Sequence, residues 1–240
     1  MKVISNLLGR TVALLNIDEL VPEQGLNVAD AIPLVTQRYG FVKAPALSDS
    51  IQKVRDEGLK FEIGKLTVSG QEHAIQDFTV WPDGLVVNAF ATTSAATFLD
   101  DFLTWGKGAL GFRVALSEVT KRLYVSQLVV EFAFSPASKL RGLWPISNAF
   151  HDALQQTYGH DFPPTEIATM KFDYDHAVAP HALRNVAPFV IERRENHRFT
   201  EGNVFFSQAP LPTENHVTLL EAFEGVLDPE SSWQGSEDKK

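Results

Sequence analysis

The segment from Ile75 to Gly106 constrains the fold more than any other part of this chain. Apolar and polar residues alternate up to Trp81, and the Asp83-Gly84 dipeptide favours a tight hairpin turn before the β-prone residues 85–87. Residues 92–94 offer hydroxyl caps for a helix, and one face of that helix is apolar: Ala95, Phe98, Leu99, Phe102 and Trp105. We therefore expect a β-hairpin followed by an amphipathic helix that ends at Gly106.

Shorter periodic segments continue this pattern over the rest of the chain. Alternation or β-rich composition predicts strands over residues 11–17, 59–68, 112–116, 123–134, 167–174, 189–194 and 203–208. Apolar spacing of three and four residues predicts helices over residues 27–39, 48–58, 144–158 and from Pro212 onward. On the helix over 144–158, one face carries Ile146, Phe150, Ala153 and Leu154.

Two strands followed by a helix recur near residues 75–106, 112–158 and 189–227. This order predicts an α+β fold: an antiparallel or mixed twisted sheet built from repeated hairpin-plus-helix units, with helices covering one face. We expect one compact domain over residues 1–227, or two packed lobes that divide near 135–142 or 159–165. From Asp228 the composition becomes polar and acidic, so residues 228–240 are expected to form a flexible tail.

Composition excludes several classes of function. The chain has no cysteine, so disulfides, thiolate metal sites and cysteine nucleophiles are absent. A formal net charge of −9 argues against general nucleic-acid binding, which depends on clustered lysine and arginine. No apolar run approaches the roughly 20 residues that span a bilayer, and polar residues interrupt the first twenty positions. We therefore expect a cytoplasmic protein that does not associate with membranes.

Motifs that would announce an enzyme are missing from the sequence. There is no Gly-x-Ser-x-Gly elbow, and Ser126, Ser135 and Ser207 lie in strand-like contexts without a partner of defined spacing. Neither a dinucleotide-binding glycine loop nor a Walker loop is present. The sequence therefore predicts no nucleotide or organic cofactor.

The strongest cluster of chemically active side chains is Asp173, Asp175, His176 and His181. On a strand, Asp173 and Asp175 point to the same side, so their oxygens could hold a divalent cation while a histidine supplies nitrogen. The alternative, which we favour, is a polar loop in which the carboxylates cap turns and the histidines face solvent. Only the first interpretation requires a metal.

Two features favour interaction with another protein. Trp233 stands in the polar tail, where an aromatic side chain either anchors a partner or is simply exposed. The apolar strand residues 128–130 and 204–206 require cover on both faces, from helices or from a partner. We therefore expect a non-enzymatic protein-binding or assembly protein, including self-association. The alternative is a metal-dependent hydrolase or nuclease that uses Asp173, Asp175, His176 and His181.

Overall fold

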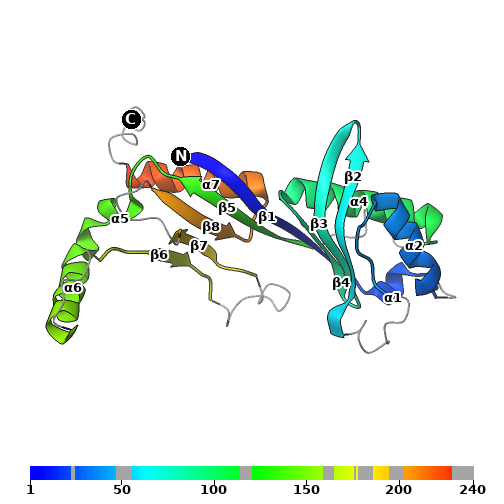
Figure 1. Ribbon diagram of the computed structural model, residues 1–240, viewed down its shortest axis with the longest axis horizontal. Helices are drawn as coiled ribbons and strands as arrows, with labels where there is room; N and C mark the ends of the chain where they lie inside the picture. The colour runs from blue at the N-terminus through cyan, green and yellow to red at the C-terminus, as the bar shows by residue number, and fades with distance from the viewer. Residues whose placement is uncertain are drawn as a thin grey trace, which may run out of the picture.

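The computed structural model describes residues 1–22, 25–46, 56–113, 121–158, 165–175, 177, 186–194 and 203–228. Its strands are β1 (Lys2–Leu14), β2 (Leu59–Val68), β3 (Gln71–Trp81), β4 (Gly84–Ala89), β5 (Arg122–Glu131), β6 (Thr169–Phe172), β7 (Phe189–Arg193) and β8 (Val204–Ala209). Its helices are α1 (Ile17–Leu20), α2 (Val28–Tyr39), α4 (Thr92–Ala109), α5 (Pro136–Lys139), α6 (Trp144–Tyr158) and α7 (Thr213–Leu227), with a 3-10 turn, η2, over Arg141–Leu143. The predicted α+β class is confirmed (Figure 1).

These strands form one eight-stranded sheet in the order β2-β3-β4-β1-β5-β8-β7-β6, and every pair is antiparallel. The order is symmetric about the central pair β1–β5. Each half of the chain supplies a central strand, then helices, then a three-stranded meander and then a final helix, which is α4 in the first half and α7 in the second. The sequence thus repeats an arrangement of elements, although the residues that fill the two halves differ.

The predicted repeat of three hairpin-plus-helix units does not match this two-fold arrangement of elements. The hairpins β3–β4 and β7–β8 each precede a long helix, as expected, but residues 112–158 contribute only one described strand before α5 and α6. Helix α6 also lies at the far end of the molecule rather than over the sheet (Figure 1). The hairpin-plus-helix description therefore fits the end of each half and not the whole chain.

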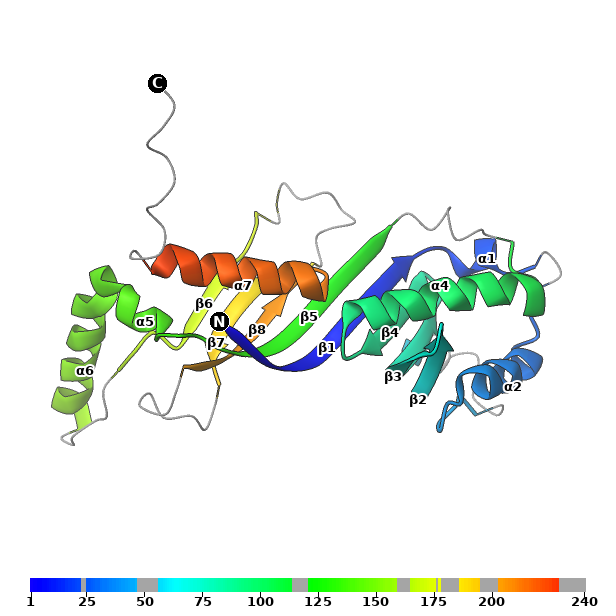
Figure 2. The same cartoon turned by 90° about the horizontal axis from the view of Figure 1, so that it is seen from above.

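Helices α4 and α7 run along the same side of the sheet and meet at their N-termini (Figure 2). The Thr92 N–H donates to Thr213 Oγ1 at 3.0 Å, and the Thr213 N–H donates to Thr92 Oγ1 at 2.7 Å. Neither helix has a side-chain cap from its own preceding residue. Each helix therefore uses a threonine of the other helix to satisfy a backbone donor that would otherwise be unpaired.

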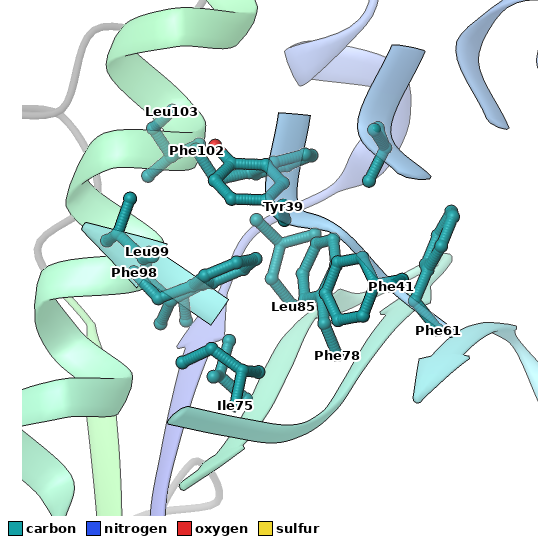
Figure 3. Packing of buried hydrophobic residues seen from close by; sticks show 14 of the residues in the cluster. Tyr39, Phe41, Phe61, Ile75, Phe78, Leu85, Phe98, Leu99, Phe102 and Leu103 are labelled. Carbon is teal, nitrogen blue, oxygen red and sulfur yellow. The ribbon is translucent and has the colours of Figure 1, made fainter. Parts of the chain in front are cut away.

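The core of the first half is a cluster of aromatic rings (Figure 3). Tyr39 of α2 packs against Phe98 of α4 with ring centroids 4.5 Å apart, and Phe78 of β3 packs against Phe102 at 4.7 Å. The Tyr39 hydroxyl donates to Asp101 at 2.9 Å, and burial raises the pKa of Tyr39 above its usual range. These contacts fix α2 beside α4, over the outer strands of the first half.

Predicted elements with strong local signals are confirmed, including the helix that follows Asn27. The Asn27 side chain accepts a hydrogen bond from the Ala29 N–H at 3.1 Å, and Gly40 ends α2 with a left-handed φ of 60°. Strand β2 spans residues 59–68 as predicted. The predicted helix over 48–58 falls largely outside the described residues.

Three predicted boundaries were wrong. Strand β1 begins at Lys2 rather than residue 11, because the polar Arg10 bonds across the sheet to Asn88 at 2.9 Å instead of interrupting the strand. Trp81 pairs with Gly84, so the hairpin turn is Pro82-Asp83, and Gly84 begins β4 rather than forming part of the predicted Pro82-Asp83-Gly84 turn. Helix α4 passes through Gly106 to Ala109.

Gly106 has a packing role rather than a terminating one. A Cβ at this position would lie 2.2 Å from the Phe112 ring, so only glycine lets that ring pack against the helix. The helix ends instead at Ala109, Leu110 is its C-cap, and Gly111 follows with a φ of 71°.

Ile63→Asn is expected to stabilise the fold by about 1 kcal/mol, since a β-branched residue is strained in the left-handed region and asparagine tolerates it. Ile63 has a φ of 56° and is 57% exposed, so the substitution removes little packing. Thermal unfolding should show a Tm increase of about 2–4 °C. The control is Ile4→Asn, which changes an isoleucine of β1 that is 46% exposed and should give no increase.

Candidate binding surfaces

The described part of the predicted metal cluster forms turn and surface contacts. Asp173 pairs with Lys171 at 2.9 Å and accepts a hydrogen bond from the Tyr174 N–H at 3.1 Å. Asp175 accepts from the Ala177 N–H at 2.9 Å. These are the contacts of carboxylates that cap turns.

The other two members of that cluster, His176 and His181, lie outside the described residues, as does Trp233. Within the described residues, no group of three or more histidine, aspartate or glutamate side chains is arranged to hold a metal ion. The metal site and the anchoring role of Trp233 therefore stay predictions.

Sequence reasoning missed a hydrogen-bonded group of Ser126, Ser207 and His216 at the centre of the second half. Ser207 Oγ donates to the Val190 carbonyl at 2.9 Å, so it accepts from the Nε2–H of His216, which lies 2.9 Å away. This assigns Nδ1 as the acceptor of the Ser126 hydroxyl at 2.8 Å. Both ring nitrogens of a neutral imidazole are thus satisfied.

This group resembles the serine–histidine pair of a hydrolase only in composition. All three side chains are 0% exposed, so no substrate reaches them. Burial lowers the pKa of His216 to about 4, which keeps the ring neutral. The group therefore has a structural role. The sequence carried one signal for it: Ser126 and Ser207 occupy the register of the buried faces of β5 and β8, where an unpaired hydroxyl would be costly.

Helix α6 carries an exposed apolar face in the second half. None of its residues is buried, and its exposed side chains include Ile146 at 68%, Phe150 at 58% and Tyr158 at 61%. Together with Leu154, these residues recur every four positions and form one continuous face, here called the α6 stripe. The helix was predicted correctly, but the cover that its apolar face requires is missing from the described part of the chain.

The base of α6 is held by polar contacts rather than by its stripe. Ser147 Oγ donates to the Thr165 carbonyl at 2.6 Å, and Thr165 Oγ1 donates to the Ser147 carbonyl at 2.8 Å. The Trp144 Nε1–H donates to the Ala137 carbonyl at 3.4 Å. None of these contacts uses a side chain of the stripe, and α6 lies beyond the end of the sheet rather than over it (Figure 2).

The outer strands of the second half are also incompletely covered. Phe172 of β6 is 51% exposed and stacks on Phe189 of β7 with ring centroids 5.4 Å apart. The ring of Phe172 also lies 6.5 Å from that of Phe223 on α7, so α7 covers this surface around Phe172 only in part. In the first half, α2 packs against the corresponding outer strand β2, and its buried side chains share one core cluster with those of β2 and β3. The second half therefore has a helix whose apolar face is uncovered and an outer-strand surface that is incompletely covered.

Among the described residues, no helix is long and apolar enough to cross a membrane. Comparison with known proteins found no protein-family model, no curated protein and no solved structure that matches this chain. Any proposal about its function therefore depends on the geometry described above.

Proposed function

We propose that this chain is a non-enzymatic assembly protein that self-associates through helix α6. One observation carries the proposal: the α6 stripe and the exposed Phe172 surface occur on the same half of the same chain. In the proposed dimer, α6 of one copy packs against β6 and β7 of a second copy, and the second copy returns the same contact.

The first half of the chain explains why a helix such as α6 is expected to cover β6 and β7. Helix α2 lies between β1 and β2 in the chain, as α6 lies between β5 and β6. On α2, the side chains of Ile32, Val35 and Tyr39 are buried against the sheet and α4. A helix in this place thus completes the core of the first half, and a partner's α6 would do the same for the second half.

A two-fold exchange also satisfies both uncovered surfaces at once. In a two-fold dimer, the same patch acts on both copies, so each stripe meets one Phe172 surface and none is left over. Burial of the stripe would stabilise the dimer because each large apolar side chain removed from water contributes roughly 1.5–3 kcal/mol.

Light scattering coupled to size-exclusion chromatography tests the proposal, over a wide range of protein concentration. We expect a dimer for the unmodified chain and a monomer for Phe150→Asp, which places a charge in the stripe. The matched control is Ala149→Asp, at the neighbouring exposed position outside the stripe, which should remain dimeric. A chain that is monomeric at every concentration would contradict the proposal.

Native mass spectrometry on the same preparations separates the remaining outcomes. A mass increase that matches another polypeptide would replace self-association with a different protein partner. A bound divalent cation that is lost in Asp173→Ala would instead favour the metal-dependent hydrolase or nuclease.

A further inference from the structure

A second candidate binding site, an apolar pocket, lies in the first half of the chain and shares no residue with the α6 stripe. A cavity of about 480 Å³ opens between α1 and α2 on one side and the strands β2, β3 and β4 on the other. Its lining is almost wholly apolar. We infer that this pocket binds an apolar small molecule with one basic nitrogen at its end.

The wall formed by the sheet and α4 is rigid. Phe78 and Phe102 are 0% and 3% exposed, and their rings interlock with those of Phe61 and Phe112 at centroid distances of 4.7–5.9 Å. Gly106 allows Phe112 to press against α4 and so fixes the end of this wall. A preformed apolar wall costs a ligand little ordering free energy on binding.

The opposite wall comes from residues 17–35 and contains short side chains. Ala31 and Val35 of α2 line the pocket, together with Leu20 of α1 and Leu26 between the helices. An apolar pocket of this kind does not retain water well, since a bound water molecule needs polar partners. Engineered apolar cavities of roughly 150 Å³ accept a benzene ring, so a pocket of this size suits two or three rings or a medium-length alkyl chain.

One charged side chain at the rim of the pocket would orient a bound ligand. Asp18 is the single charged residue in the described lining, and it is exposed at the rim. Its carboxylate accepts no hydrogen bond from a described residue, whereas its carbonyl accepts one from Arg113 at 2.8 Å. A ligand with its alkyl or aromatic body in the pocket would therefore place a basic nitrogen beside this carboxylate.

The test uses the neutral fluorescent dye N-phenyl-1-naphthylamine, whose emission rises in apolar surroundings. Titrations are made with the full chain carrying Phe150→Asp, so that the α6 stripe does not offer the dye a second apolar site. We expect saturable binding that falls by about tenfold in Ala31→Leu, which fills the pocket. The matched control, Ala29→Leu, adds the same atoms at an exposed position of the same helix and should bind as before.

Leu26→Trp is a second blocking variant, at a partly exposed position that accepts a larger ring with less strain than the core does. Circular dichroism shows which variants fold. No saturable dye binding, or unchanged binding in folded Ala31→Leu or Leu26→Trp, would overturn the inference.

Competition against the dye then tests the basic nitrogen. Decylamine, decanol and decanoate share one chain length and are used below their micelle concentrations. We expect decylamine to displace the dye about tenfold better than decanoate, and Asp18→Asn to remove that preference while it leaves dye binding intact. Equal displacement by the amine and the acid in the Asp18 protein would overturn the assignment. A monomeric chain in the light-scattering test would leave this result unaffected, so the two proposals fail separately.

Discussion

Gly9→Ala is expected to lower the free energy of unfolding by about 3 kcal/mol, the upper end of the usual cost of overpacking. A Cβ at Gly9 would lie 2.1 Å from the carbonyl carbon of Ala91 and 2.2 Å from the nitrogen of Thr92. These are backbone atoms at the start of α4, so no change of rotamer relieves the clash. Strand β1 has little freedom to retreat, because Gly9 pairs with Ala89 on one side and with Ser126 on the other.

The matched control is Gly108→Ala, which adds the same methyl group where nothing lies within 4 Å. Gly108 occupies the exposed last turn of α4, where alanine should stabilise the helix by about 0.5–1 kcal/mol. Urea unfolding of both variants and the parent chain gives the two differences. A Gly9→Ala variant as stable as its parent would show that α4 can lift from β1 at no cost, and would contradict this account of the sheet centre.

An element of the fold could be predicted where the residues that determine it lie close together in the sequence. Asn27 and Gly40 bracket α2 within the helix's own sequence, and the alternation of residues 59–68 identifies β2 without reference to any other strand. The early part of β1 carried no such signal. Its Arg10 is satisfied by Asn88, which lies 78 positions away, and a periodicity over a few residues cannot include such a partner.

The same limit applies to the surfaces. The spacing of Ile146 and Phe150 predicts an apolar face on α6, yet periodicity does not say what covers that face. The pocket beside α2 joins residues from Ile17 to Phe112, so no single segment contains its lining. The turn contacts of Asp173 and Asp175 are local, but their histidine neighbours lie outside the described residues, so the metal site stays a prediction.

Acidification is expected to destabilise the protein by about 3 kcal/mol through His216 alone, between pH 6.5 and pH 4. Burial lowers the pKa of His216 from 6.5 to about 4 in the folded chain. Within that interval the unfolded chain binds a proton that the folded chain does not, so the free energy of unfolding falls as the pH falls. Above pH 6.5 the ring is neutral in both states, and this contribution to stability is fully present.

Two variants separate burial from hydrogen bonding as the cause. His216→Gln has no titrating ring, so its stability should change less than that of the parent between pH 6.5 and pH 4, although it starts lower at pH 7. Ser126→Ala removes the hydroxyl 2.8 Å from Nδ1 and should cost about 1–2 kcal/mol, but it keeps the buried ring and therefore the pH dependence. Urea unfolding at a series of pH values measures each curve. Parallel curves for His216→Gln and the parent would place the pH dependence on other groups. Converging curves would mean that the neutral imidazole of His216 stabilises the centre of the second half. The first half depends instead on the close packing of β1 against α4 that Gly9 allows.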